Sequence, residues 1–133
     1  MRNFLLIPAL VLALAACSST AASPSEAPGA PPADALEVSL ADFMIDPSDL
    51  TVAGPVITVD VTNDGPTPHN FSVRTSSGEV LFATEDLPVG GTETLTGTLE
   101  PGDYTIFCAL AGHESLGMSG TLTVTGSELS SSR

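Results

Sequence analysis

The amino-acid pattern predicts an all-β protein: a Greek-key antiparallel β-sandwich of seven to eight short strands. Apolar and polar residues alternate along several short runs, which is the period of a half-buried strand. Clusters of glycine, proline, asparagine and aspartate separate these runs and favour turns. Nothing between the runs is long enough for a helix, except a single turn around 43–49 or 83–87.

Each expected strand is bounded by one of these turn clusters. The first strand, 36–41, alternates leucine and valine with polar or small residues. A threonine-rich strand follows Gly91, and we expect its Leu95 and Leu99 to point inward. The remaining strands are expected at 50–52, 56–62, 71–73, 80–82, 104–108 and 120–125.

Several single residues carry further structural expectations. Asn63–Pro66 forms a strong turn cluster, and Pro101-Gly102 suits the centre of a type II turn in which glycine takes a positive φ. Tyr104 is either a tyrosine corner, bonded to nearby backbone, or an ordinary core aromatic. Met44 is expected to pack in the core.

The first residues have the features of an export signal, which we place at 1–16. Arg2 supplies a positive start, and an apolar run of about a dozen residues follows. This run is short for a membrane-spanning helix, which needs about 20 apolar residues. It ends in Leu-Ala-Ala before Cys17, which resembles a bacterial lipobox, where the cysteine receives lipid after cleavage. The alternative is an ordinary signal peptide with an incidental Cys17.

The rest of the chain divides into a tether, a domain and a tail. Residues 17–34 contain the lipidated cysteine and a disordered Pro/Ser/Ala tether, 35–126 the domain, and 127–133 a flexible tail. We therefore expect an exported lipoprotein on the outer face of the cytoplasmic membrane or in the periplasm. A Cys17–Cys108 disulfide is the competing assignment, but it would tie a floppy terminus to the interior.

The charge is strongly acidic. Sixteen acidic residues face three arginines and no lysine, for a formal net charge of −13. Nucleic-acid binding is excluded because it depends on Lys and Arg neutralising phosphates. Attachment to an anionic membrane surface by charge is excluded for the same reason, so membrane association would depend on the lipid. The acidity serves either solubility, including a saline habitat, or steering toward a basic partner.

One stretch concentrates metal-binding side chains. Four residues separate Cys108 from His113, and four more separate His113 from Met118. The only other histidine, His69, follows Pro68 far back in the chain. Two histidines, one cysteine and a methionine are the ligand set of a mononuclear blue-copper site.

Each of these residues also has an ordinary explanation. A lone histidine is usually a surface group, a buried cysteine a small hydrophobe, and a methionine part of the core. Their conjunction favours a metal site, with Gly112 and Gly117 giving the loop its backbone freedom. Zinc could use the same ligands, but a thiolate with a thioether favours copper.

Two segments resemble those of the cupredoxins, the type 1 blue copper proteins that include plastocyanin and azurin. Tyr104–Val124 resembles their C-terminal ligand loop, and Pro68-His69-Asn70-Phe71 resembles their N-terminal histidine motif. The likeness covers roughly 35–125. The two four-residue gaps are most similar to those of rusticyanin and sulfocyanin.

The resemblance implies a role for each matching residue. It implies one copper ion with His69, Cys108 and His113 as equatorial ligands and Met118 as the axial ligand. It also implies that Asn70, beside Pro68, tethers the ligand loop and bonds near the cysteine sulfur.

The function expected from the resemblance is single-electron transfer between redox proteins by a monomer, not enzymatic catalysis. A binuclear copper centre would need a second loop cysteine, and a multicopper oxidase would need more histidines. Cupredoxins exchange electrons through the exposed edge of the loop histidine, here His113, within an apolar patch. The candidates for that patch are Leu110, Ala111, Leu116, Pro66 and Pro68.

Two other functions remain open. A copper chaperone or storage lipoprotein would bind the metal in order to deliver it, usually through methionine- or histidine-rich stretches that this chain lacks. A metal-free adhesive sandwich is the third option, and the conjunction of ligands disfavours it.

Overall fold

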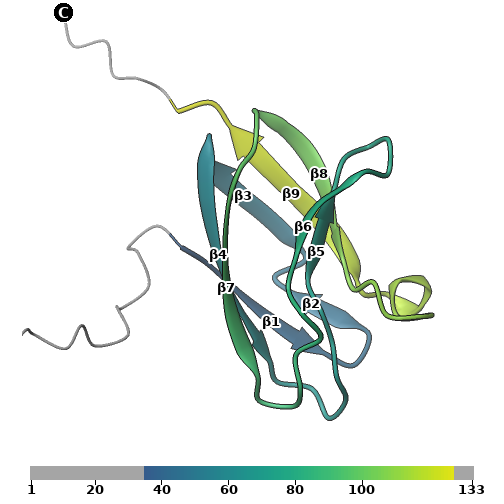
Figure 1. The fold of residues 1–133 in the computed structure, drawn as a ribbon. Coiled ribbons are helices and arrows are strands. Elements are labelled where there is room, and N and C mark those ends of the chain that lie inside the picture. Colours follow the sequence, from purple (N-terminus) through teal and green to yellow (C-terminus); the bar gives the residue numbers. More distant parts are fainter. Residues whose placement is uncertain (1–34, 128–133) are drawn as a thin grey trace, which may run out of the picture.

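The computed structural model describes residues 35–127, which form nine strands and one short 3-10 helix in two stacked sheets (Figure 1). The expected signal peptide, the expected lipidation site Cys17 and the expected tether lie outside the described residues. So do all but the first residue of the expected tail. None of the helices in the described part is long and apolar enough to cross a bilayer.

The first sheet has the strand order β2-β1-β4-β7. Its strands are β1 (Leu36–Ala41), β2 (Met44–Asp46), β4 (Val56–Asn63) and β7 (Thr92–Thr98). β4 shows the strict inside–outside alternation that the period of two predicts, with Ile57, Val59 and Val61 buried. Its other face carries Thr58, Asp60 and Thr62 after the exposed Val56, and it is mostly polar, as expected for a sheet with one side toward solvent.

The second sheet has the order β3-β9-β8-β5-β6. Its strands are β3 (Asp49–Ala53), β5 (Ser72–Arg74), β6 (Val80–Ala83), β8 (Gly102–Phe107) and β9 (Ser119–Thr125). The 3-10 helix η1 (Glu114–Leu116) lies in the loop between β8 and β9. The predicted all-β sandwich is therefore confirmed.

The expectation of purely antiparallel sheets was wrong in two places. β1 pairs with β4, and β3 pairs with β9, in parallel registers. The physical reason is the route of the chain: after β1 it turns back as β2 and crosses to the other sheet as β3 before it returns as β4. Because β1 and β4 are not joined by a hairpin, they can run in the same direction.

The core lies between the sheets and is almost entirely aliphatic. Phe71 is the largest of its fully buried side chains. Leu95 of β7 is partly buried and packs against the core. Leu99 is also buried, so both leucines point inward as predicted. Five buried polar side chains break this pattern: Asn63, His69, Asn70, Ser72 and Thr84.

Three local expectations were wrong. Met44 is 52% exposed, because the alternation of β2 turns the neighbouring Ile45 inward. The segment 43–49 contains β2 instead of a helical turn, since its backbone groups pair with β1. Gly102 has a positive φ, as predicted, but its value of 157° is far from the roughly 80° of a type II turn, and the residue starts β8.

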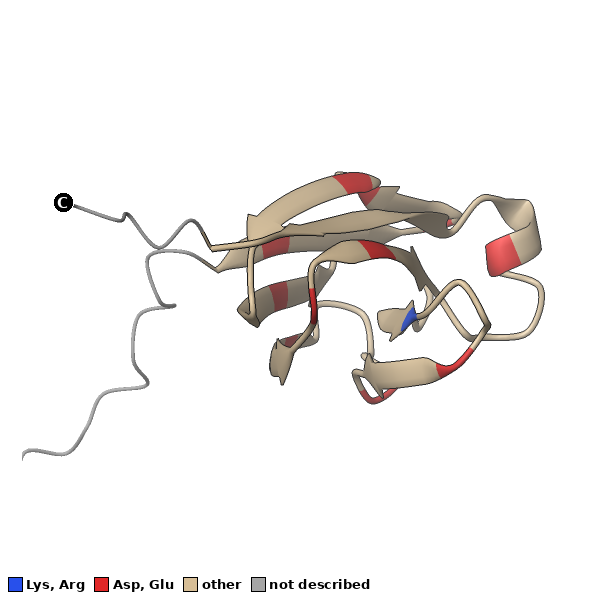
Figure 2. Cartoon of the chain, turned by 90° about the horizontal axis from the view of Figure 1, so that it is seen from above, with Lys and Arg blue, Asp and Glu red and all other residues tan. Residues whose placement is uncertain are grey.

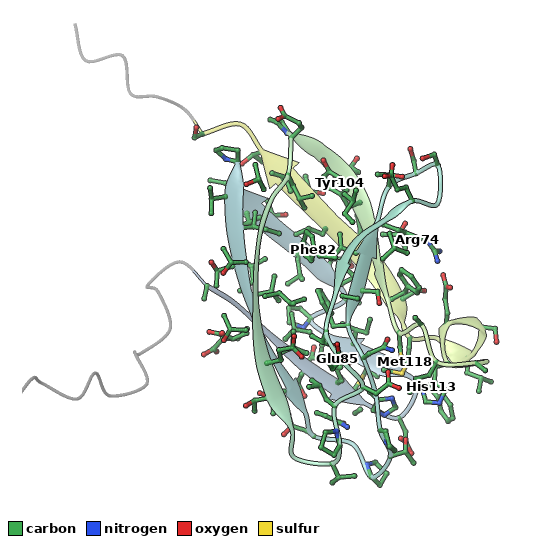
Figure 3. All side chains as sticks on the ribbon, in the orientation of Figure 1. Arg74, Phe82, Glu85, Tyr104, His113 and Met118 are labelled. Atoms are coloured by element: carbon green, nitrogen blue, oxygen red, sulfur yellow. The ribbon has the colours of Figure 1, made fainter. Side chains whose placement is uncertain are left out.

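Tyr104 forms a tyrosine corner. Its hydroxyl donates a hydrogen bond to the carbonyl oxygen of Glu100 at 2.8 Å, while its ring packs against the core. This corner lies at the upper end of the sandwich in Figure 3, opposite His113 and Met118. It therefore braces the Leu99–Tyr104 connection far from the histidines.

Replacing Tyr104 with Phe should lower the free energy of unfolding by about 0.5–1.5 kcal/mol, the net value of one hydrogen bond. The ring and its packing are retained, so the loss would report the hydroxyl alone. Urea denaturation measures it, and an unchanged midpoint would show that the corner does not contribute to stability.

Candidate metal centre

Three predicted ligands come together at one end of the sandwich. His69 follows the turn after β4, Cys108 directly follows β8, and His113 directly precedes η1. One ligand atom from each residue lies within 4.8 Å of the other two. His69 and Cys108 are fully buried and His113 is partly exposed, so the cluster is closed toward the core and open at the imidazole of His113.

The distances within the cluster suit atoms that share one ion. Nδ1 of His69 lies 3.1 Å from Nδ1 of His113, and the Cys108 Sγ lies 3.6 Å from the same His113 nitrogen. Metal bonds in proteins are about 2.0 Å to histidine nitrogen and about 2.3 Å to cysteine sulfur. One ion can therefore reach both nitrogens and the sulfur without rearrangement of the backbone.

Met118 belongs to the same end of the molecule. Its side chain is fully buried, and Figure 3 shows it beside His113. Its backbone N–H donates to the His113 carbonyl at 3.1 Å, and its carbonyl accepts from the Cys108 N–H at 3.0 Å. The backbone of Met118 thus lies against the loop that carries Cys108 and His113, where β8 ends and β9 begins.

The backbone around His69 is held by a buried amide. Asn63 Nδ2 donates to the carbonyls of Thr67 and Leu87, both at 2.9 Å, and its Oδ1 accepts from the N–H of Gly65. His69 and Leu87 also exchange both backbone hydrogen bonds. The Asn63–Pro66 turn is therefore formed as predicted, and it fixes the position of the imidazole.

The outer nitrogen of His69 meets a carboxylate. Nε2 lies 3.1 Å from the Asp42 Oδ1, which also accepts a hydrogen bond from the Thr67 hydroxyl at 2.7 Å. An ionised carboxylate can only accept, so Nε2 carries the proton and Nδ1 presents its lone pair to the cluster. Carboxylates often orient metal-binding histidines in this way.

Asn70 links the two ligand segments. Its side-chain oxygen accepts from the Ala109 N–H at 2.7 Å, and its backbone N–H points at the Cys108 sulfur from 3.5 Å. Its amide nitrogen donates to Asp86 at 2.8 Å. These contacts match the role that the resemblance implied for Asn70, whereas Pro68 is exposed and shapes only the backbone before His69.

The ligand loop is anchored by an arginine from β5. Arg74 donates to both carboxylate oxygens of Glu114, the residue after His113, and stacks 4.2 Å above the centroid of the Phe107 ring. These hydrogen bonds lower the pKa of Glu114 and raise the pKa of Arg74 relative to their ordinary values, although burial opposes both shifts. The loop also needs left-handed backbone at Gly112 and Gly117, which have φ 84° and 120°.

The residues predicted to form a docking patch differ in their exposure. Leu116 is 60% exposed and Ala111 and Pro66 are exposed, whereas Leu110 is partly buried against the core. Phe43 was missed: its ring is 46% exposed and packs edge-on to the imidazole of His113, with the centroids 5.8 Å apart.

Sequence reasoning also missed residues that support the ligands: Asp42, Thr67, Asp86 and the Arg74–Glu114 pair. None of these has a motif of its own. Asn63 was expected only as a turn residue, and its hydrogen bonds to Thr67 and Leu87 were not foreseen. The only hint in the sequence was Arg74, which is the one arginine between Arg2 and Arg133 in a very acidic chain without lysine. Figure 2 shows it as the one blue residue among many red ones.

The donor set fits copper better than other metals. Thiolate and thioether donors favour Cu(I), and imidazole suits both copper oxidation states. Magnesium and calcium prefer oxygen ligands, and among residues 35–127 no other group of histidine, cysteine or acidic residues is close enough to hold an ion.

The close approach of Gly65 to His69 offers a test of the cluster. A β-carbon at Gly65 would lie 2.9 Å from His69 Nε2 and 3.1 Å from the Cα of Ala41. Gly65→Ala should therefore displace the imidazole, lower copper affinity about tenfold or more, and destabilise the fold by about 1–3 kcal/mol. Copper titration and thermal unfolding measure these effects.

Gly126→Ala is the matched control, because its β-carbon would meet only Pro101, at 3.9 Å. An equal loss of affinity in both variants would show that contact with His69 is not the cause.

Comparison with known proteins agrees with this geometry. Residues 6–124 match the family model described as a cupredoxin-like domain. No curated protein matches the chain significantly.

Several solved structures are similar. Reduced auracyanin from the photosynthetic bacterium Roseiflexus castenholzii is 25% identical, with a TM-score of 0.62, over 69% of this chain and 97% of that one. Auracyanin B is 23% identical, with a TM-score of 0.64, over 73% and 92%. A purple cupredoxin from Nitrosopumilus maritimus is 23% identical, with a TM-score of 0.51, over 68% and 99%. From the match of its family model along most of its length, the chain belongs to the cupredoxin-like domain family.

Proposed function

We propose that this protein is a single-electron carrier that uses one type 1 copper ion. His69, Cys108 and His113 would hold the ion, with Met118 as the weaker axial ligand. The observation that carries the proposal is the convergence of two imidazole nitrogens and one thiol sulfur within 4.8 Å of one another. The bound copper would supply a one-electron couple between Cu(I) and Cu(II).

The protein's own contribution is to hold the donors still. Cu(I) and Cu(II) prefer different geometries, so fast electron transfer needs ligands that move little when the charge changes. Here Asn63 fixes the His69 segment, Asn70 joins it to the cysteine strand, and the Arg74–Glu114 pair fixes the loop after His113. The site is thus supported from both sheets.

The structural relatives support this proposal. The solved structure of the auracyanin from Roseiflexus castenholzii is of the protein reduced with sodium dithionite. The similarity to it covers 69% of this chain and 97% of that one. Among residues 35–127, the cluster is the only group of three or more histidine, cysteine or acidic side chains close enough together to hold an ion.

Electrons would enter and leave at the His113 imidazole. It is the one ligand of the cluster that is not fully buried, and the exposed ring of Phe43 packs against it. The exposed Leu116 follows it by three residues in the same loop. An apolar surface with an exposed imidazole suits a brief encounter with a redox protein, since such complexes have small interfaces. Leu110, Ala111 and Pro66 would contribute to the same surface.

The protein would work outside the cytoplasmic membrane, attached through lipid on Cys17. The seventeen residues that follow could span roughly 50 Å if they adopt a polyproline conformation. That reach would let a monomeric domain move between two membrane-associated partners.

A copper chaperone or storage protein is the alternative. It is less consistent with a ligand cluster of which two members are fully buried, because delivery of copper needs accessible ligands. A visible spectrum with a redox titration separates the two: a reversible blue centre supports the carrier, and colourless exchangeable copper supports the chaperone.

Cys108→Ser should abolish the intense visible absorption of the copper-loaded protein. That band arises from charge transfer from thiolate to copper, and a hydroxyl group cannot replace the thiolate. Absorption spectra of both proteins after addition of cupric salt provide the measurement. A band that persists in the variant would exclude Cys108 as the ligand.

Leu116→Glu should slow electron exchange between reduced and oxidised copies by about tenfold, because a desolvated carboxylate would oppose contact at this face. The exchange rate is measurable by NMR line broadening, and no other partner is needed. Val56→Glu is the matched control, because Val56 is 62% exposed and Leu116 is 60% exposed. Val56 begins β4, and the chain reaches His69 only after the opposite end of that strand, so this control adds the same charge away from the ligand cluster. Equal rates in the two variants would place the docking face elsewhere.

A further inference from the structure

The turn between β1 and β2 touches both imidazoles of the cluster. This turn consists of Asp42 and Phe43, because Ala41 at the end of β1 pairs with Met44 at the start of β2. The Asp42 carboxylate meets His69, and the Phe43 ring meets His113. Two adjacent residues from one turn therefore contact two ligands that lie 44 positions apart in the sequence.

The Asp42 contact is directed at one nitrogen. Oδ1 accepts from the Nε2–H of His69 at 3.1 Å and from the Thr67 hydroxyl at 2.7 Å. The His69 side chain is fully buried and that of Asp42 is 37% exposed, so the carboxylate closes the solvent side of the imidazole. The protonated nitrogen faces outward as a result, and the lone pair of Nδ1 faces the thiol and His113.

The Asp42 charge is not neutralised by an arginine or lysine in the described part of the chain. The single arginine between residues 35 and 127 is Arg74, and both oxygens of Glu114 engage it. Only the Thr67 hydroxyl and the His69 imidazole donate to the Asp42 carboxylate. A full negative charge therefore stands one imidazole ring away from the position that an ion would occupy.

The turn is held in a conformation that its sequence does not favour. Phe43 has φ 61°, the only left-handed residue other than glycine in the described structure. This conformation costs about 1–2 kcal/mol for a residue with a β-carbon. Such strain persists where the surroundings determine it, often at functional sites.

The ligand loop makes room for this turn. A β-carbon at Gly117 would lie 3.0 Å from the Phe43 carbonyl oxygen, so a side chain there would press against the turn. The ring of Phe43 lies at 72° to the imidazole of His113, an edge-to-face packing. The turn is thus packed between the two ligand segments.

We infer that the Asp42–Phe43 turn positions both imidazoles and that the Asp42 carboxylate lowers the reduction potential of the copper centre. This inference rests on the proposed function. The oxidised centre carries one more positive charge than the reduced centre, so a nearby anion stabilises the oxidised form more strongly. Removal of that anion should therefore raise the potential.

Asp42→Asn tests the electrostatic part. Asparagine has nearly the same shape and keeps an oxygen that can accept from Nε2–H, so His69 should keep its orientation while the charge is lost. We expect the blue band to remain and the reduction potential to rise. Voltammetry or a redox titration with a mediator measures the shift.

Asp103→Asn is the matched control. Asp103 also accepts a hydrogen bond from a threonine hydroxyl, that of Thr123 at 2.8 Å, but it lies next to Tyr104 at the other end of the sandwich. The two variants change the net charge equally. If both shift the potential by the same amount, the Asp42 carboxylate has no specific effect and the inference is wrong.

The positioning part has two tests. Asp42→Ala removes the acceptor as well as the charge, and copper affinity should fall by about 10–100-fold. Phe43→Asn removes the ring but keeps a residue that tolerates left-handed backbone, and we expect faster release of copper. Release at the wild-type rate would show that Phe43 does not position His113.

The tautomer of His69 can be determined without copper or a variant. Long-range ¹H–¹⁵N NMR of the metal-free wild-type protein should show a proton on Nε2 and none on Nδ1. A proton on Nδ1 would overturn the inference even if the variants failed to fold. Failure of the proposed function would look different, because the wild-type protein would then show no reversible blue centre.

Discussion

The close approach of the two histidine Nδ1 atoms is the contact on which the rest of the site depends. Two lone pairs at 3.1 Å repel each other unless a proton or a cation lies between them. The protein nevertheless holds the two rings there, with a thiol sulfur 3.6 Å from one of them. Every other feature of this end of the sandwich can be understood as support for that arrangement.

The buried polar side chains show where this support is concentrated. Most of the core is aliphatic, and the few buried polar residues include His69, the adjacent Asn70, Asn63 and Thr84. Asn63 makes three hydrogen bonds to backbone, and the Thr84 hydroxyl accepts from the N–H of Phe71. Buried polar groups are costly unless they are paired, so this group stays in place because its bonds are satisfied. Apolar packing between the sheets and satisfied hydrogen bonds around His69 therefore stabilise the sandwich together.

The acidic composition has a consequence for the site. Within residues 35–127, one arginine serves the whole domain, and it binds the ligand loop at Glu114 while it stacks on Phe107 beside Cys108. An arginine fork is suited to this position because it binds both carboxylate oxygens and packs on an aromatic ring at the same time. The remaining acids of residues 35–127, Asp42 among them, have no arginine or lysine partner there. The candidate ligands therefore lie in a strongly acidic domain, which we relate to the inferred lowering of the potential.

The sequence by itself determined the class of fold, the four candidate ligands and the family. A period-two pattern with frequent turns is local, and the only histidines and the loop cysteine can be counted without a structure. The tyrosine corner was one of two options for Tyr104, and the structure decided it. The sequence did not reveal that two strand pairs are parallel, because pairing between β1 and β4 depends on the route of the chain through both sheets.

Only the tertiary structure showed what surrounds the ligands. Asp42 lies 27 positions before His69, and Arg74 lies 40 before Glu114, so no spacing rule connects them. Met44 was expected in the core and lies on the surface. β2 has only three residues, too few for the sequence to show which of them point inward. Contacts of this kind arise when separate turns are packed at one end of a sandwich. They depend on which residues become close in space, and a pattern of residue types along the chain does not give that information.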